Sequence, residues 1–244
     1  MLTRLVDCGY TVQFVSHAAA IIGVDFPQAL LDVESVLVNF AIPIEELVGS
    51  GGGETKGTQR LRRTLADRGW RKHNFVIERR IDGEQRGSIS HEVDHVRKFE
   101  AGTLGLEIEW NNKDPFFDRD LENFKRLHAE GAISAGIIVT RGPDLQRDLP
   151  DLILRFAERN TLDSAATLSA FGVSRTARQQ RDIEKSVAAG RPFRQAWVDN
   201  FCQDKYGTST THWQKLQDRL HRGVGNPCPL LLIGIPSSVV RFGG

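Results

Sequence analysis

The sequence predicts an α/β protein in which helices flank a mixed β-sheet. The first observation behind this prediction is a run of three extended segments separated by short glycine-containing turns, at 74–81, 88–97 and 103–110. Turn pairs of this kind close antiparallel neighbours. The three segments are therefore expected to form an antiparallel meander.

The second observation is an alternation of helix and strand after the meander. Apolar residues recur at helical spacing over 117–128, and a buried strand is expected at 132–140. A second fully apolar strand is expected at 229–235. Since helices that connect strands favour parallel pairing, the sheet should be mixed.

The remaining elements follow from the same periodicities. A strand is expected at 10–15, helices at 28–40 and 56–68, and a mostly helical, polar stretch at 144–200. We expect one domain that spans 1–244.

Composition excludes several classes of protein. The chain has 244 residues, a formal net charge of +1 and 40% hydrophobic residues, which suits a globular protein with a large core rather than a disordered chain. Its apolar runs fall short of the roughly 20 residues that a membrane crossing needs. We therefore expect a cytoplasmic protein without a membrane partner.

Charge is spread unevenly along the chain. Residues 1–55 hold seven acidic residues and one basic residue, whereas 175–222 hold ten basic and five acidic residues. A basic surface suits a polyanion such as DNA, because neutralised phosphates release condensed counterions. A solvated helix face would have the same composition, so charge alone leaves both interpretations open.

Candidate catalytic residues lie on the third segment of the meander. In 103–110 the apolar residues alternate with Gly105, Glu107 and Glu109, so the two carboxylates share one face about 7 Å apart at the backbone. Asp94 lies across the turn on the neighbouring strand. Three carboxylates suit Mg²⁺ or Mn²⁺, which activate water for phosphodiester hydrolysis. An acidic strand face paired with Lys or Arg remains the alternative.

The segment 91–95 matches the His-Glu-x-x-His pattern of zinc peptidases. That pattern works on a helix, where residues four apart are neighbours. The flanking glycines and the Ser-Ile-Ser run favour a strand, on which His91 and His95 would lie about 13 Å apart. A zinc peptidase is therefore a remote alternative.

Four segments together resemble a known family. The run Glu-Ile-Glu-Trp-Asn-Asn-Lys-Asp-Pro-Phe-Phe-Asp-Arg-Asp at 107–120 is the most specific, and the segments at 92–96, 209–216 and 228–235 add to it. They resemble the type II restriction endonucleases of the BglII/BstYI group, with BamHI as a more distant relative. The resemblance extends from about residue 51 to 235.

This resemblance implies the PD-(D/E)XK nuclease fold and a homodimer that cuts palindromic double-stranded DNA with Mg²⁺, for which Mn²⁺ would substitute. It makes Asp94 and Glu107 the metal-binding acids, with the Ile108 carbonyl as a further ligand. Glu109 stands where most of the superfamily carries lysine; it would take a proton from the attacking water or help to hold that water. Lys113 is a candidate for a displaced cationic group.

Further site residues are expected outside the meander. Glu54, at the start of a helix, is a possible additional metal ligand, although an acid there also suits the helix dipole. The glycine run at 51–53 lacks a following Gly-Lys-Ser/Thr, so no nucleotide cofactor is expected. DNA contacts are expected within the basic region and beside the catalytic strand, with these candidates: Asn111, Asn112, Thr210, Thr211, His212, Lys215, Arg175 and Arg178.

Arg175, Arg178 and Arg181 are expected on one helix face that contacts the DNA backbone. A DNA-binding protein without catalysis is the main alternative to a nuclease, and the presence of all three acids favours the nuclease.

Overall fold

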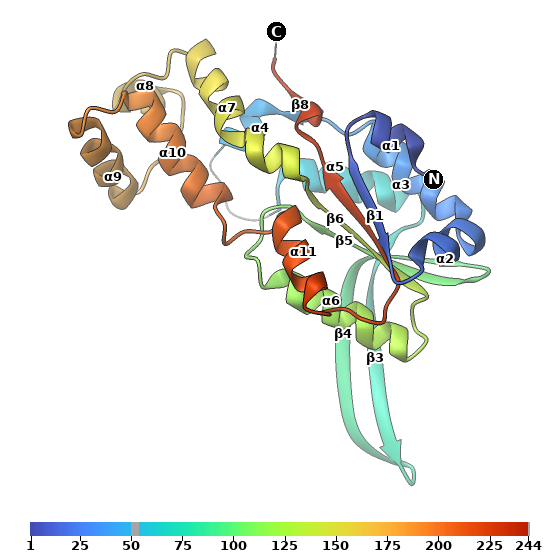
Figure 1. Ribbon diagram of the computed structural model, residues 1–244. Coiled ribbons are helices and arrows are strands. Elements are labelled where there is room, and N and C mark those ends of the chain that lie inside the picture. The colour runs from blue at the N-terminus through green and yellow to red at the C-terminus, as the bar shows by residue number, and fades with distance from the viewer. Residues whose placement is uncertain (50–53, 244) are drawn as a thin grey trace.

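The structure is a computed structural model that describes residues 1–49 and 54–243, so the glycine run at 51–53 lies outside the described residues. Its centre is a six-stranded sheet in the order β1-β7-β6-β5-β4-β3 (Figure 1). The strands are β1 (Thr11–Val15), β3 (Arg71–Ile81), β4 (Glu84–Phe99), β5 (Gly102–Glu109), β6 (Ala135–Arg141) and β7 (Leu230–Ile235).

The pairing confirms the predicted mixed sheet. β3, β4 and β5 form the antiparallel meander, β5, β6 and β7 are parallel, and β1 pairs antiparallel with β7. β6 and β7 are buried along their whole length, which explains the apolar sequence of β7 and of β6 up to Val139. A separate short parallel pair joins β2 (Ile42–Pro43) to β8 (Val240–Arg241), just after a 3₁₀ turn (Ser237–Val239).

Helices cover both faces of the sheet. One face carries α6 (Phe116–Ala129) and α11 (Trp213–His221), which pack on Val93, Ile138 and Leu232. The opposite face carries α1 (Thr3–Asp7), α2 (Ala18–Asp25), α3 (Pro27–Val38), α4 (Ile44–Val48), α5 (Lys56–Asp67) and α7 (Pro143–Arg159). None of the helices in the described ranges has the length and hydropathy that a membrane crossing requires.

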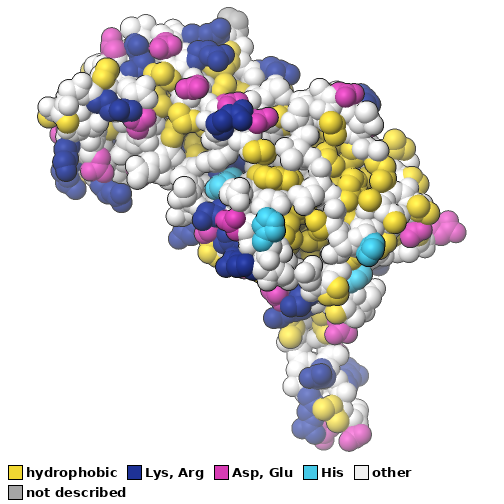
Figure 2. Space-filling view, viewed as in Figure 1, with side chains coloured by type: hydrophobic (Ala, Val, Ile, Leu, Met, Phe, Trp, Pro, Cys, Tyr) yellow, Lys and Arg dark blue, Asp and Glu magenta, His cyan; other side chains and the backbone are white. Residues whose placement is uncertain are grey.

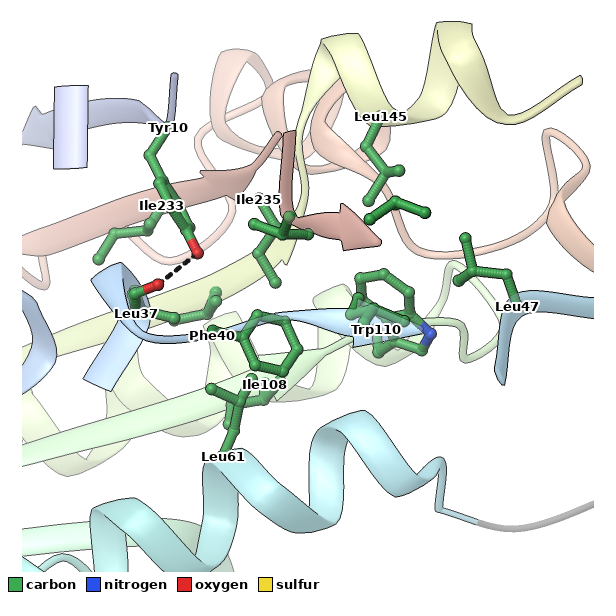
Figure 3. Close-up of a cluster of buried hydrophobic side chains, with 14 of the residues drawn as sticks. Tyr10, Leu37, Phe40, Leu47, Leu61, Ile108, Trp110, Leu145, Ile233 and Ile235 are labelled. Carbon is green, nitrogen blue, oxygen red and sulfur yellow. Dashed lines mark hydrogen bonds between the residues drawn. The ribbon is translucent and has the colours of Figure 1, made fainter. Parts of the chain in front are cut away.

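The larger core lies on the face of α3 and α5. Figure 3 shows Phe40, Leu61, Ile108 and Trp110 packed together there, and Tyr10 Oη donates a 2.7 Å hydrogen bond to the Leu37 carbonyl. The even-numbered residues of β5 belong to this core. The odd-numbered residues of β5 must therefore face α6, as the alternation predicts.

Two parts of the molecule project from this body (Figure 1). The distal halves of β3 and β4 form a two-stranded arm that closes with the Asp82–Gly83 turn. The helices α8 (Ala165–Ala170), α9 (Ala177–Ala188) and α10 (Phe193–Tyr206) form a helical extension. On the face that Figure 2 shows, Lys and Arg side chains gather over the extension and the arm, whereas hydrophobic side chains gather over the half that contains β1 and α2.

A β-bulge interrupts β4 beside β5. His73 pairs with Val93 and Arg71 with Val96, so three steps on β4 oppose two steps on β3. The extra residue reverses the alternation of β4, because Val93 and Val96 both contact the core under α6. Asp94 and His95 occupy the bulge, a feature that re-aims side chains.

Candidate active site

Glu107 and Glu109 stand on the α6 side of β5 near its carboxyl end. Their neighbours Leu106 and Ile108 point into the core on the other face. Both carboxylates are buried, with 4% and 3% of their surface exposed. The predicted shared face is therefore present, and it lies inside the molecule rather than on an acidic surface.

The bulge brings Asp94 to the same place. Its backbone N–H donates to Glu107 Oε1 at 3.3 Å, while its carboxylate is about half exposed. Lys72 Nζ, from β3, lies 3.7 Å from Asp94 Oδ1 and 2.8 Å from Glu92 Oε1. The structure thus brings together the three acids that the sequence predicts, with an exposed lysine at their outer edge.

A fourth carboxylate, which the sequence analysis missed, comes from α6. Asp120 is 1% exposed, and its Oδ2 atom is buried without a hydrogen-bond partner among the described residues. Its Oδ1 atom accepts a 2.8 Å hydrogen bond from Arg119 Nε, and Arg119 Nη2 lies 2.8 Å from the same oxygen. A signal was available, because Asp120 interrupts the apolar stripe of Phe117, Leu121 and Phe124. We call Glu107, Glu109 and Asp120 the carboxylate cluster.

Burial and mutual repulsion raise the pKa values of the cluster. Burial raises the pKa of Glu107 well above its usual range, and the negative charges of Asp120 and Asp94 raise it further. Burial and then Asp120 raise the pKa of Glu109 to about 9, against the hydrogen bond from Asn112 (2.8 Å) and the charge of Arg119. The pKa of Asp120 is raised by burial as well. Such a cluster is stabilised by a proton or a cation.

The residues fit a hard divalent cation. The donors are carboxylate oxygens, and Mg²⁺ typically takes only one or two protein carboxylates and keeps several waters. No three His, Cys, Asp or Glu side chains within 1–49 and 54–243 converge as a complete ligand set, so this is no closed structural metal site. Asp120 Oδ2 is buried without a hydrogen-bond partner among the described residues, and the raised pKa values mean that the cluster holds protons when no cation is bound.

The zinc-peptidase alternative is wrong, because residues 91–95 lie on β4. His91 Nδ1 lies 2.8 Å from Asn123 Oδ1 on α6, whereas His95 pairs with Leu106 and contacts its carbonyl at 3.2 Å. Because of the bulge, the two rings lie on opposite faces of the sheet. They cannot share a metal ion.

Glu54 and Lys113 make their contacts with residues outside the carboxylate cluster. Glu54 pairs with Arg62 at 3.1 Å, and the cap of α5 is Thr55, whose Oγ1 accepts from the Thr58 N–H. Lys113 is exposed and forms an isolated β-bridge with Thr210. The cation beside Glu109 is Arg119, whose Nη2 is 3.7 Å from Glu109 Oε1. Arg119 was not expected from the sequence.

Several predicted DNA contacts line one cleft of about 680 Å³ between the end of β5 and the helical extension. The residues after β5 pair with the loop before α11, since the Thr211 N–H donates to the Asn112 carbonyl at 2.8 Å. Lining residues that were predicted are Asn111, Asn112, Lys113, Thr210 and Arg175; lining residues that were missed include Gln179, Asn200 and Lys205.

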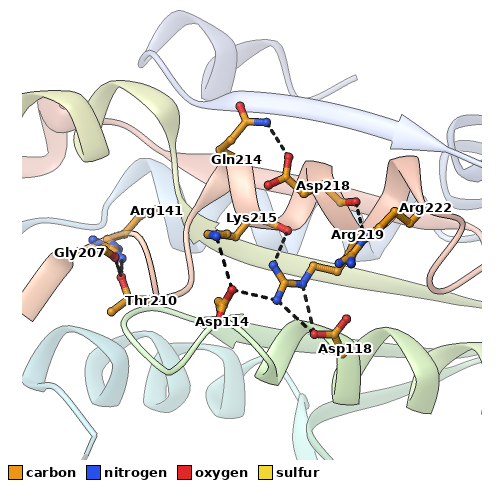
Figure 4. Close-up of polar contacts among 10 residues, drawn as sticks. All are labelled: Asp114, Asp118, Arg141, Gly207, Thr210, Gln214, Lys215, Asp218, Arg219 and Arg222. Carbon is orange, nitrogen blue, oxygen red and sulfur yellow. Dashed lines mark hydrogen bonds and ion pairs between the residues drawn. The ribbon is translucent and has the colours of Figure 1, made fainter.

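Other predicted DNA contacts have structural partners. Thr211 is fully buried, and its Oγ1 accepts from the Asn112 N–H at 3.0 Å. His212 is buried too, and desolvation lowers its pKa to about 4, so its ring is neutral at pH 7. Lys215 lies 3.7 Å from Asp114, which also accepts from Arg219 (Figure 4). These side chains hold α11 to the start of α6.

The predicted arginine face is only partly right. Arg175 precedes the α9 cap residue Thr176, and its guanidinium donates to the Ala165 carbonyl and Ser169 Oγ, so it does not share a helix face with Arg178. Arg178 is exposed on α9, 3.5 Å from Asp182. The packing of this loop against α8 fixes the position of Arg175. Local sequence periodicity does not predict that packing.

Comparison with known proteins agrees with this geometry. No curated protein matches the chain. A family model, described as restriction endonuclease BglII/BglIII, matches residues 10–235. That range contains the sheet, the carboxylate cluster and the cleft, and members of the family use divalent metal ions to cut DNA at specific sequences. The chain therefore belongs to the BglII/BglIII restriction endonuclease family and is a type II site-specific deoxyribonuclease.

Proposed function

We propose that the protein cuts both strands of a palindromic DNA sequence in the cytoplasm, as a homodimer and with Mg²⁺. Asp94, Glu107 and the Ile108 carbonyl would hold the ion. The observation that carries this proposal is the burial of Glu107 and Glu109 beside Asp94. Buried like charges are stable only when a cation or a proton compensates them.

The reaction is phosphodiester hydrolysis. The oxygen of a water molecule forms a bond to phosphorus, one ester P–O bond breaks, and the leaving oxygen takes a proton from solvent. A bound Mg²⁺ would supply charge stabilisation at phosphorus and would lower the pKa of the attacking water. In this proposal Glu109 accepts the proton of the attacking water. Burial raises the pKa of Glu109 to about 9, and a bound cation would lower that pKa, so that the ionised carboxylate could accept a proton.

We propose that side chains lining the cleft beside β5 recognise the DNA sequence. Asn112 and Lys113 lie just beyond the end of β5, Thr210 forms a β-bridge with Lys113, and Arg175 lines the same cleft. Amide and basic side chains can bind base edges or phosphates. Arg178, which is exposed on α9, would contact the DNA backbone.

The test uses purified protein and phage DNA at low salt, with Mg²⁺, with Mn²⁺ and with EDTA. Discrete fragments with either ion and none with EDTA are expected, and sequencing their ends gives the recognition site. A smear of fragments would contradict sequence specificity. Binding without cleavage under all three conditions would favour the non-catalytic alternative.

The homodimer has a separate test. The described residues hold one carboxylate cluster, and two copies related by a two-fold axis would present one cluster to each strand of a palindrome. Sedimentation equilibrium with specific DNA should give a protein mass of twice the 27.3 kDa of one chain. A mass of one chain per DNA would contradict the dimer.

Divalent cations should stabilise the protein more at higher pH. The folded-state pKa of Glu109 is raised to about 9, so its contribution to the free energy of unfolding is fully present below the unfolded value and is lost as the pH rises through 9. Cations need deprotonated ligands and restore this stability. The increase in melting temperature caused by excess Ca²⁺ should therefore be larger at about pH 8.5 than at about pH 6.

The Glu107→Gln variant is the control in that experiment, and its Ca²⁺-dependent increase should be smaller at both pH values. An increase that is equal at both pH values in the wild-type protein would contradict a cation at the carboxylate cluster.

DNA binding should weaken steeply with salt. Each phosphate that a basic side chain neutralises releases a counterion, so several contacts predict a loss of at least about 100-fold in affinity between about 50 and about 200 mM salt. Fluorescence anisotropy without divalent ions measures this directly. A dissociation constant that stays constant over this range would contradict contacts from the basic region.

A further inference from the structure

Arg119 is held rigidly at the mouth of the carboxylate cluster. Its Nε donates a 2.8 Å hydrogen bond to Asp120 Oδ1, its Nη2 lies 2.8 Å from the same oxygen in an ion pair, and its guanidinium carbon lies 4.4 Å from the centre of the Phe116 ring. Asp120 is 1% exposed, so it is a fixed anchor for the guanidinium. An arginine held by a buried carboxylate and an aromatic ring loses little further side-chain freedom on binding.

The guanidinium also borders the site itself. Arg119 Nη2 lies 3.7 Å from Glu109 Oε1, while the other oxygen of Glu109 accepts from Asn112. About half of the Arg119 side chain is exposed, and its Nη1 makes no hydrogen bond or ion pair within the part of the chain that the structure describes. A guanidinium has five N–H donors, so donors remain for a ligand that arrives from solvent.

The charges around the site indicate which ligand this is. Asp94 and the carboxylate cluster place four acidic side chains where an anionic phosphodiester must bind. Lys72 lies on the Asp94 side of the site and Arg119 on the Glu109 side, whereas Lys113 pairs with Thr210 at the cleft. Arg119 is thus the cation beside the residue proposed to accept the water's proton.

We propose that Arg119, positioned by Asp120, donates hydrogen bonds to the scissile phosphate and stabilises the negative charge that develops there during hydrolysis. The planar fork of a guanidinium matches two phosphate oxygens, and preorganised donors of this kind act more strongly in the transition state than in the ground state. This inference rests on the proposed catalytic role of the carboxylate cluster.

The test compares Arg119→Ala with Arg126→Ala, which removes an exposed arginine two turns further along α6. Single-turnover cleavage is measured with excess protein on a DNA that the wild-type protein cuts, and DNA affinity is measured separately with Ca²⁺. Arg119→Ala should lower the cleavage rate by about 10²–10³-fold with a much smaller change in affinity. Arg126→Ala should cut at the wild-type rate.

A double variant separates this role from simple neutralisation of Asp120. If Arg119 only compensates the buried Asp120 charge, Arg119→Ala combined with Asp120→Asn should cut at the rate of Asp120→Asn alone, and that result would overturn the proposal. If Arg119 binds the phosphate, the double variant should be clearly slower than Asp120→Asn alone. Should Arg119→Ala be unfolded at the assay temperature, Arg119→Gln, which keeps an N–H donor for Asp120 without the charge, replaces it in both comparisons.

Glu107→Gln, measured in parallel, distinguishes a failure of the proposed catalytic site from a failure of the proposed role of Arg119. Wild-type cleavage by Glu107→Gln would remove the proposed catalytic site. An inactive Glu107→Gln together with wild-type cleavage by Arg119→Ala would overturn only the role of Arg119.

Discussion

Replacing Glu107 with glutamine should abolish DNA cleavage while leaving DNA binding nearly unchanged. Glu107 is buried between Asp94 and Asp120, and the substitution removes the charge of a proposed metal ligand with little change in side-chain volume. We expect a loss of at least about 10³-fold in the cleavage rate, which corresponds to about 4 kcal/mol of transition-state stabilisation.

The same variant should be more stable than the wild-type protein without metal. Burial and the charges of Asp120 and Asp94 raise the pKa of Glu107, so the ionised form is unfavourable in the folded state. Glutamine removes that charge, and thermal melting in EDTA at about pH 8 should show a higher midpoint. Glu122→Gln, at a partly exposed position on α6, is the matched control. Rapid cleavage by Glu107→Gln would remove Glu107 from the catalytic site.

Replacing Arg141 with methionine should have the largest effect on stability. Arg141 is fully buried in β6, and its guanidinium donates to the carbonyls of Trp110 (3.0 Å) and Thr211 (2.8 and 3.1 Å) and to Thr210 Oγ1 (2.5 Å). It also lies over the Tyr206 ring. Methionine would leave these buried acceptors without a donor, which should cost about 3–5 kcal/mol of unfolding free energy.

Urea denaturation measures this cost, and Arg147→Met, on the exposed side of α7, should leave the midpoint unchanged. Arg141 joins the end of β5 to the loop before α11, and both segments line the cleft. We therefore expect Arg141→Met to weaken DNA binding at temperatures where it is folded. A loss below about 1 kcal/mol would show that water or neighbouring groups satisfy the acceptors.

The sequence predicts the catalytic strand well because its signal is local. Alternation places Glu107 and Glu109 on one face whatever surrounds the strand, and the turn before β5 brings Asp94 alongside. Asp120 and Arg119 depend instead on how α6 packs across the sheet. Only the position of Asp120 within an apolar stripe indicated its burial.

The DNA contact predicted at Thr211 depends likewise on packing that the sequence does not reveal. Thr211 is fully buried, and its carbonyl accepts a hydrogen bond from Arg141, an arginine in a central strand. The bulge in β4 is equally hidden in the sequence. It depends on pairing with β3, and it separates His91 from His95 more completely than strand spacing alone does.

The position of β7 in the sheet has a consequence for synthesis of the protein on the ribosome. β7 lies between β1 and β6, so Val15 reaches its partner only when Leu230 has been made. Until then the nascent chain holds β6 as an apolar sheet edge, which favours chaperone binding. Because β6 also supports β5, the carboxylate cluster gains its final support late, and a partly made chain should not cut the DNA of the cell that produces it.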